Sequence, residues 1–288
     1  MKSGIFIHNK AIKNIKMQNV LISFSSLITG LIYLLPLFWL ILCSFKTEEE
    51  IFKVPVIIFP SHLYLQPYLD QLSGYYNMFR AFANSLIISI CTMCLSIVLS
   101  TPAAYGLARF QFRGRHAMVL SFLVTQMLPA SLLLTPLFIT FNRLHLYNTF
   151  VSPVIADATI AIPFSVLILR TYVLSVPKDL DEAAAVDGCN SFSTFVRIIF
   201  PNIFPGVIVS SVFSFLFAWG DLIYANTFIN KQPLMPITAG IYNFIGQYGV
   251  SWNRVMAFGV VSVIPVVFIF IFMQKYIISG LTSGSVKG

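Results

Sequence analysis

Six stretches of this chain are each long and apolar enough to cross a lipid bilayer, and they limit the possible fold more than any other feature. They lie near residues 20–45, 81–108, 117–141, 151–174, 203–228 and 255–278. A membrane-spanning helix needs about 20 mainly apolar residues. Charged residues make up 10% of the sequence, whereas soluble domains carry about 25%. The sequence therefore predicts an all-α, polytopic membrane protein with six transmembrane helices.

Prolines recur inside the predicted spans, which indicates that several of these helices are irregular. They are Pro36, Pro102, Pro129, Pro136, Pro163 and Pro265. In a helical bundle, neighbouring helices can satisfy the carbonyl groups that a proline leaves free. Such prolines fit the kinked helices of transporters, but each can equally be a packing irregularity without a role in function.

Basic residues predict the orientation of the spans, because Lys and Arg gather in cytoplasmic loops. The loop between the second and third predicted spans is short and contains Arg109, Arg113 and Arg115. With an even number of spans, we expect this loop, both termini and residues 1–19 on the cytoplasmic side. The net charge of +8 is spread over short loops instead of one patch, which argues against nucleic-acid binding.

Catalytic and cofactor-binding motifs are missing from the sequence. It contains no G-x-x-x-x-G-K-[ST] nucleotide-binding loop, no H-E-x-x-H zinc motif and no G-x-S-x-G nucleophile motif. The four histidines lie in different segments. Cys91 and Cys94 form a C-x-x-C pair inside an apolar stretch, where two small residues on one helix face are expected instead of a redox or zinc site. We therefore expect a chain that is not an enzyme and binds no metal or cofactor itself.

Acidic residues inside the predicted spans are candidates for a translocation path, because burying a charge in a membrane is costly. Asp157 lies in the outer part of the fourth span, and Asp221 follows Trp219 toward the outer end of the fifth. A role of these three residues in a solute path or gate stays open, and so does a role in helix capping or interfacial solvation. Their place near the outer boundary argues against a proton relay at the membrane midplane.

The predicted last external loop, residues 227–254, is rich in glycine and aromatic residues. Its aromatic side chains include Tyr242, Phe244, Tyr248 and Trp252. Such side chains can contact a partner protein or a sugar, but they can equally form the aromatic belt found at membrane surfaces. The residues alone leave both alternatives open.

A polar segment, residues 175–201, interrupts the apolar sequence between the fourth and fifth predicted spans. Ser175 and Pro177 fit the start of a short helix, and acidic residues follow where the helix dipole favours negative charge. Gly188 can turn the chain with a positive φ, and Phe192 begins an apolar pattern at helical spacing. The segment is predicted to form a helix–turn–helix elbow, which is either a solvated connector or a docking element.

Residue spacing inside this segment resembles the E-A-A-x3-G-x9-I-x-L-P loop of bacterial ABC importer permeases, with one phenylalanine in place of leucine. The matching residues are Glu182, Ala183, Ala184, Gly188, Ile198, Phe200 and Pro201. Residues 274–288 resemble the terminal Q-R-Y-x-x-x-G-L-T-x-G-A-V-K-G of MalG-type carbohydrate permeases, and residues 102–110 are similar to the end of their second span. The chain as a whole resembles the MalG-type permeases of sugar ABC importers.

This resemblance implies which residues contact partner proteins. In that family the elbow docks in a cleft of a cytoplasmic ATPase, which assigns the coupling contact to Glu182, Ala183, Ala184, Asp187, Gly188 and Phe192. The C-terminal tail, residues 279–288, can reach the ATPase dimer through Gly284, Ser285, Val286, Lys287 and Gly288. The last external loop, residues 227–254, would contact an extracytoplasmic sugar-binding protein through its aromatic residues.

The resemblance also implies a function. Residues 1–288 would form one transmembrane domain in the bacterial cytoplasmic membrane, paired with a second, non-identical permease. ATP and Mg²⁺ would bind to the partner ATPase dimer, and this chain would form half of the path for a sugar or oligosaccharide. The alternatives are an ion-coupled secondary transporter, an ABC permease for a non-sugar solute and an intramembrane enzyme.

Overall fold

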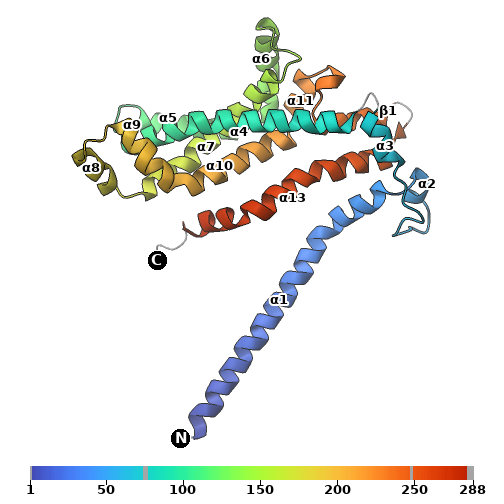
Figure 1. Cartoon of the computed structure of the whole chain (residues 1–288), viewed down its shortest axis with the longest axis horizontal. Coiled ribbons are helices and arrows are strands. Elements are labelled where there is room, and N and C mark those ends of the chain that lie inside the picture. Colours follow the sequence, from blue (N-terminus) through green and yellow to red (C-terminus); the bar gives the residue numbers. More distant parts are fainter. Residues whose placement is uncertain (1, 74–76, 247–248, 284–288) are drawn as a thin grey trace. The chain divides into compact units, whose positions relative to one another are not determined.

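The computed structural model describes residues 2–73, 77–246 and 249–283, and most of these residues lie in helices (Figure 1). The long helices are α1 (Lys2–Ser44), α4 (Met78–Arg109), α7 (Val151–Ser175), α10 (Phe200–Gly220) and α13 (Trp252–Ser283). Shorter helices are α2 (Glu48–Ile51), α3 (Gln66–Ser73), α5 (Arg115–Met127), α6 (Ala130–Arg143), α8 (Asp179–Val186), α9 (Ser191–Thr194), α11 (Ile223–Phe228) and α12 (Ile237–Gly240). A π-helix, η1 (Phe195–Ile199), and two 3₁₀ helices, η2 (Gln232–Leu234) and η3 (Ile241–Phe244), complete the helical elements.

Membrane-length helices account for most of the predicted spans. In the described part of the chain, five helical segments are long and apolar enough to cross a bilayer. They are Leu21–Ser44, Met78–Arg109, Val151–Ser175, Ser191–Gly220 and Trp252–Gln274. The helical fold and its apolar spans are therefore confirmed. Two strands of two residues each, β1 (Ile245–Gly246) and β2 (Gly249–Val250), pair antiparallel and add a small hairpin.

The third predicted span is not one straight helix. Its residues form α5 and α6, which meet at an angle of 99° and make the sixth span if the pair is counted together. Leu128 and Pro129 separate them, and both have extended backbone angles. Proline has no N–H to continue a helix, and it pushes the preceding residue out of the helical region. Of the prolines in the predicted spans, Pro129 therefore ends a helix, whereas Pro136 lies inside α6.

The fifth predicted span also differs from the structure. It was expected over residues 203–228, but α10 ends at Gly220 and residues 223–228 form the separate helix α11. The backbone is extended at Asp221, with φ −65° and ψ 132°. The Asp221 carboxylate accepts hydrogen bonds from the backbone N–H groups of Tyr224 and Ala225, at 3.2 and 2.8 Å. An acceptor before a new helix satisfies N–H groups that have no helical partner, so Asp221 starts α11.

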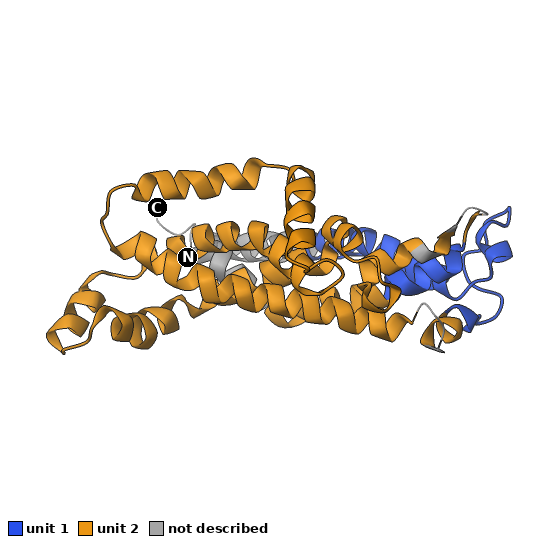
Figure 2. Cartoon of the chain, turned by 90° about the horizontal axis from the view of Figure 1, so that it is seen from above, with its two compact units in different colours: residues 1–67, 251–260 blue, residues 68–250, 261–288 orange. Residues whose placement is uncertain are grey.

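The chain divides into two compact units, residues 1–67 with 251–260 and residues 68–250 with 261–288 (Figure 2). In the first unit, the buried Lys46 closes the end of α1. Its Nζ donates a hydrogen bond of 2.6 Å to the carbonyl oxygen of Ile57 and lies 4.4 Å from the centre of the Trp39 ring. A carbonyl and an aromatic face both stabilise a buried ammonium group. Lys46 thereby attaches the loop after α2 to the end of the first span.

Glu48 and Glu50 add further polar links inside the first unit. One Glu48 carboxylate oxygen accepts a hydrogen bond of 3.1 Å from the backbone N–H of Asn253, at the start of α13. Glu50 accepts one of 3.2 Å from the backbone N–H of Ser61. Hydrogen bonding from the Ser61 side chain lowers the pKa of the Glu50 carboxyl group below its ordinary value. These links hold α2 and the loop that follows it.

In the second unit, α4, α7 and α10 pack against one another. Three fully buried hydroxyl groups, one from each helix, form a ring of hydrogen bonds: Ser96, Ser165 and Ser214, with oxygen–oxygen distances of 3.0 to 3.2 Å. A hydroxyl donates once and accepts twice, so a ring of three satisfies every donor. Small polar residues allow close helix approach in membranes, and their hydrogen bonds add to the packing.

Gly206 on α10 marks the closest approach between two of these helices. A Cβ atom at this position would lie 2.5 Å from ring atoms of Tyr172 on α7. Real Cβ atoms do not come this close to other atoms, so only glycine fits without movement of the ring or the helix. By contrast, a Cβ at Gly220, on the same helix, would meet nothing within 4 Å.

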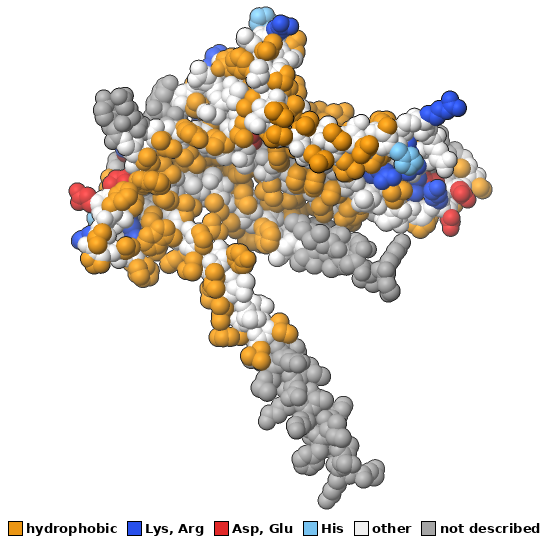
Figure 3. Space-filling view, turned by 180° about the vertical axis from the view of Figure 1, so that it is seen from behind, with side chains coloured by type: hydrophobic (Ala, Val, Ile, Leu, Met, Phe, Trp, Pro, Cys, Tyr) orange, Lys and Arg blue, Asp and Glu red, His pale blue; other side chains and the backbone are white. Residues whose placement is uncertain are grey.

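Figure 3 shows one face of the chain covered mainly by hydrophobic side chains, with charged side chains confined to a few places. Many exposed residues on α1 and α13 are large and apolar, including Leu31, Tyr33, Phe268 and Phe270. In water such a surface would be costly, since burying apolar area is worth about 25 cal/mol per Å². This surface agrees with a chain whose solvent is lipid.

We predict that Gly206→Ala destabilises the chain by about 1–3 kcal/mol, the usual cost of overpacking, because the new methyl group collides with Tyr172. Unfolding of the purified protein in mixed detergent micelles measures this change. Gly220→Ala is the matched control and should leave stability unchanged or slightly raised. Adding Tyr172→Leu to Gly206→Ala should restore part of the loss; equal stability of the two glycine variants would contradict the close contact.

Candidate functional site

The predicted elbow is present as the two short helices α8 and α9, which connect α7 to α10 (Figure 1). Asp179, Asp181 and Glu182 occupy the first turn of α8, where the helix dipole favours them. The expected capping role of Ser175 is wrong. Ser175 still belongs to α7, and its hydroxyl donates to the Tyr172 carbonyl oxygen at 2.7 Å, so α8 begins after Lys178 without a side-chain cap.

Gly188 makes the turn of the elbow, with φ at +81°. The backbone N–H of Cys189 donates to the carbonyl of Ala184 at 2.9 Å, and that of Gly188 donates to the carbonyl of Ala185 at 3.1 Å. These two bonds form a Schellman motif, which satisfies the last carbonyl groups of a helix and needs a left-handed residue just after it. The spacing from Ala184 to Gly188 is therefore the spacing of a helix stop signal.

The second arm of the elbow starts at Asn190, whose side-chain oxygen accepts a hydrogen bond of 2.8 Å from the backbone N–H of Ser193. This cap begins α9. The helix continues through η1 into α10 without a break in helical backbone. The elbow is thus joined to α7 by residues 176–178 and to α10 by uninterrupted helix.

Exposure divides the sequence-predicted coupling residues into two groups. Glu182, Ala183, Asp187 and Gly188 are exposed, and the Phe192 side chain keeps 75% of its surface exposed. Ala184 is 2% exposed, because its methyl group points into the elbow. The structure therefore places Ala184 inside the elbow and the other coupling residues on its surface.

Val186 is an exposed apolar residue that sequence reasoning missed. It ends α8, and 87% of its surface is exposed. Together with Phe192 it gives the otherwise polar tip of the elbow an apolar surface, which we call the elbow tip. The signal for Val186 was available in the sequence, since it lies two residues before Gly188 on the short helix.

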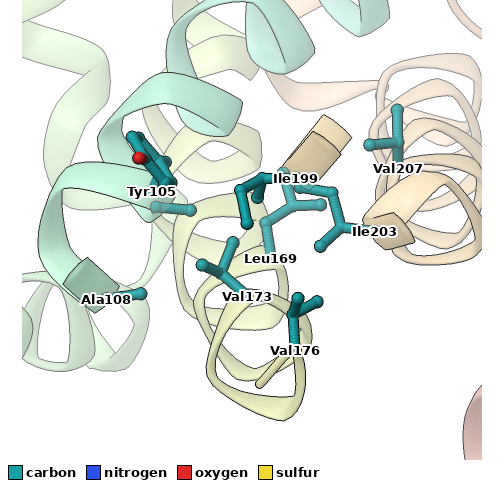
Figure 4. Close-up of a cluster of buried hydrophobic side chains, with 9 residues drawn as sticks. Tyr105, Ala108, Leu169, Val173, Val176, Ile199, Ile203 and Val207 are labelled. Atoms are coloured by element: carbon teal, nitrogen blue, oxygen red, sulfur yellow. The ribbon is translucent and has the colours of Figure 1, made fainter. Parts of the chain in front are cut away.

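A hydrophobic cluster holds the elbow's base against the spans (Figure 4). Its side chains come from α4, α7 and the start of the helix that contains η1 and α10. The members are Ala104, Tyr105, Ala108, Leu169, Val173, Val176, Ile199, Ile203 and Val207. Six of these nine residues are at most 3% exposed, so the base of the elbow is a packed core.

Polar contacts lie beside this cluster. Arg109, at the end of α4, pairs with Asp181 of α8, with Nη2 and Oδ2 2.9 Å apart. The same Nη2 donates to the Val176 carbonyl oxygen at 2.9 Å. A pocket of about 260 Å³ opens next to the pair, lined by both arms of the elbow and the end of α4. Sequence reasoning placed Arg109 and Asp181 in separate loops and did not connect them.

The three candidate path residues occupy different environments. Asp157 on α7 is fully buried, and neither carboxylate oxygen has a hydrogen-bond partner within the described chain. Asp221 caps α11. Trp219 is buried on α10, where its ring stacks on Phe215 and meets Phe82 edge to face. Its Nε1 donates a hydrogen bond of 3.0 Å to the Ser262 carbonyl. Capping and packing therefore account for Asp221 and Trp219, whereas Asp157 has no such explanation.

The aromatic residues of the predicted external loop are spread over several elements. Tyr242 on η3 is 50% exposed and Trp252 at the start of α13 is 39% exposed, whereas Phe244 is buried. Tyr248 lies outside the described residues, as do the tail residues Gly284, Ser285, Val286, Lys287 and Gly288. The loop itself is tied to α4: the Asn84 side chain donates to the carbonyl groups of Pro233 and Met235, both at 3.0 Å.

Comparison with protein families identifies relatives of this chain. Residues 96–283 match the family of binding-protein-dependent transport system inner membrane components. The probable ABC transporter permease YurM of Bacillus subtilis is 34% identical over 257 residues, covering 88% of this chain and 83% of that protein. The arabinooligosaccharides permease AraQ of Halalkalibacterium halodurans is 32% identical, and the alignment covers 88% of this chain and 91% of AraQ. The trehalose/maltose permease MalG of Thermococcus litoralis is 31% identical, over 94% of this chain and 98% of MalG.

Solved structures share the fold. A bacterial ABC transporter that imports the acidic polysaccharide alginate contains a chain that superposes with a TM-score of 0.76 at 20% identity, over 91% of this chain and 96% of that one. A chain of the MetNI methionine ABC transporter superposes with a TM-score of 0.57 at 16% identity, over 70% of this chain and 95% of that one. At these identities the likeness establishes the architecture of the chain.

We predict that Gly188→Val loosens the elbow, because a side chain at positive φ costs about 1–2 kcal/mol, whereas Gly188→Asn is tolerated, since asparagine adopts this conformation more readily. Hydrogen exchange of the α8 and α9 backbone amides measures the change. Gly114→Val is the matched control, because Gly114 also has a positive φ and a Cβ added there would meet nothing within 4 Å. Slow exchange in Gly188→Val, as in the unsubstituted chain, would contradict the role of the turn.

Proposed function

The chain belongs to the family of binding-protein-dependent transport system inner membrane components, and from this premise we propose that it is the membrane-spanning permease subunit of an ATP-driven oligosaccharide importer. Its elbow would dock on a cytoplasmic ATPase dimer. A second, non-identical permease would supply the other half of the path, and an extracytoplasmic binding protein would deliver the sugar.

One observation carries the docking proposal: the elbow tip is apolar and exposed. Val186 and Phe192 are 87% and 75% exposed on a segment rich in acidic and small residues. Large apolar side chains left exposed on such a segment favour a protein partner. The small side chain of Ala183 and the bare backbone of Gly188 beside them allow another protein's surface to come close.

The energy source would lie in the partner. This chain has no nucleotide-binding loop, so ATP and Mg²⁺ would bind to the ATPase dimer, and this chain would not be catalytic. The tail, Gly284 to Gly288, would add a second contact to that dimer. This arrangement would put the elbow and both termini on the cytoplasmic side of the membrane.

The covalent path through the elbow suggests how the ATPase would move the spans. Only residues 176–178 separate α7 from α8, and continuous helix leads from α9 into α10. A displaced elbow must therefore displace the nearby ends of α7 and α10. Closure of the ATPase dimer would bring two such elbows together, and the spans would change from inward-facing to outward-facing.

Oligosaccharides are the proposed solute, since relatives at 31–32% identity are permeases for arabinooligosaccharides and for trehalose and maltose. Asp157 is the residue of this chain that we assign to the path or gate, because its buried carboxylate has no hydrogen-bond partner among the described residues. Asp221 and Trp219 would shape the outer end of the path by holding α11 and α13. The exposed Tyr242 and Trp252 are each candidates for contact with the binding protein, as is Tyr248, whereas the predicted contact of Phe244 would need this buried side chain to become accessible.

An ion-coupled transporter is the second candidate, favoured by the buried Asp157, whose carboxylate accepts no hydrogen bond in the part of the chain that the structure describes. Such a residue in a membrane span is a possible ion or proton site. It would predict uptake that collapses with an ionophore and continues without ATP. The importer predicts the opposite dependence on both treatments.

We predict that Phe192→Asp and Val186→Asp each weaken binding of the ATPase by about tenfold or more, because burying one such side chain is worth about 1.5–3 kcal/mol and about 1.4 kcal/mol changes an equilibrium constant tenfold. The measurement is the amount of ATPase that co-purifies with the tagged chain from its native membrane in mild detergent.

Phe112→Asp is the matched control for this experiment. Phe112 is 44% exposed, lies in the neighbouring loop and is predicted to face the same side of the membrane. It should leave ATPase recovery unchanged. Full recovery with Phe192→Asp, or equal loss with Phe112→Asp, would refute docking through the elbow tip.

A further inference from the structure

Arg109 connects three elements that are far apart in the sequence. Its guanidinium group belongs to the last residue of α4. It pairs with Asp181 in the first turn of α8 and donates to the carbonyl of Val176, the C-cap residue directly after α7. The Nη2–Oδ2 distance of 2.9 Å makes an ion pair, although its angle is too poor for a hydrogen bond. One side chain thus joins two spans and the elbow.

The pair is shielded from water more than most surface ion pairs. The Arg109 side chain is 7% exposed and that of Asp181 is 21% exposed. Charges in such surroundings attract each other more strongly than in water, and removing one partner leaves the other buried and unpaired. The end of a helix also leaves carbonyl groups without partners, and Arg109 satisfies the one at Val176.

Tyr105, one turn before Arg109 on α4, points to the same place. Its ring lies 5.1 Å from that of Phe195 at the start of η1, centre to centre. Its hydroxyl is 3.5 Å from Oδ1 of Asp181, at the limit of a hydrogen bond. The end of α4 therefore contacts both arms of the elbow. The Tyr105 ring contacts Phe195 in η1, which continues α9, and Arg109 pairs with Asp181 in α8.

Packing alone does not fix the angle between α8 and α4. The pocket of about 260 Å³ separates the elbow from the end of α4, and Arg109 and Asp181 both line it. Where side chains fill all space, the core sets the geometry. Here the paired side chains line a space that is not filled, so the ion pair adds a constraint on α8 that packing beside the pocket does not supply.

We propose that Arg109 is a positioning residue that transmits elbow movement to α4. The proposal rests on the proposed function, in which the ATPase moves the elbow. The chain connects the elbow directly to α7 and α10, whereas α4 is reached only through non-covalent contacts. The Arg109–Asp181 ion pair is the charged part of that connection, with the Tyr105 hydroxyl beside it, and without the ion pair α4 no longer follows the elbow.

The experiment places one spin label on each side of the pair, in the complete complex reconstituted in nanodiscs. Cys94, exposed on α4, carries the label in a chain whose other cysteines are serine. In a second chain, without Cys94, Asp179→Cys carries the label on α8. The electron paramagnetic resonance spectra of the two labels are compared before and after addition of ATP, Mg²⁺ and vanadate. This comparison can be made without knowing which sugar is transported.

In the unsubstituted chain both labels are expected to respond to nucleotide. In Arg109→Gln and in Asp181→Asn, the elbow label should still respond and the α4 label should lose its response. A purely structural defect would instead remove both responses together with the bound ATPase. The double variant should lose no more than either single variant, because both substitutions break the same pair.

Arg113→Gln is the control, since Arg113 is exposed in the same loop; it should leave both responses intact. A persistent α4 response in Arg109→Gln, or losses that add in the double variant, would overturn the proposal. If the Arg109→Gln chain fails to assemble with the ATPase, the response of the α4 label in Asp181→Asn tests the proposal instead: loss of that response supports it, and a persistent response overturns it. An elbow label that ignores nucleotide in the unsubstituted chain would instead refute the proposed function itself.

Discussion

Backbone groups inside a lipid bilayer must find hydrogen-bond partners within the protein, and this constraint explains where the chain is helical and where it is not. Long helices satisfy it directly. At the ends of helices, side chains pair with the backbone groups that lack a partner within the helix. The Asp221 carboxylate accepts hydrogen bonds from N–H groups at the start of α11, and the Arg109 guanidinium donates to the carbonyl of Val176 after α7. Pro129 stands where the third span breaks and has no N–H to satisfy. Side chains at the ends of helices therefore decide the course of the chain through the membrane.

The same principle shapes the elbow. A Schellman turn at Gly188 satisfies the end of α8, and the Asn190 side chain satisfies the start of α9. With its own backbone groups paired, the elbow can expose an apolar tip at Val186 and Phe192 without unfolding. Its base is held by the packed cluster around Leu169 and Ile199. A firm base and an exposed tip are what a segment needs if it is to pass movement from a partner into the spans.

The sequence predicted the helical class, the positions of most spans and the elbow, because hydrophobic runs and glycine signals are local properties. It missed the break at Pro129 and the early end of α10 at Gly220, since an apolar run does not show where its helix stops. It assigned Ser175 to a cap, although the hydroxyl binds inside α7. It also missed the Arg109–Asp181 pair, because no local pattern indicates that the end of α4 meets α8. The membrane orientation, the role of Asp157 in the path or gate, and the partner contacts of Tyr242 and the tail stay predictions.

The central claim is that the elbow tip carries the contact with the ATPase. Its most direct test is a photo-crosslinking amino acid at position 192 in the intact cell membrane, with position 112 as reference. The account predicts a covalent adduct with the ATPase from position 192 and none from position 112. An adduct of position 192 with lipid or the second permease alone, with no ATPase recovered, would contradict it.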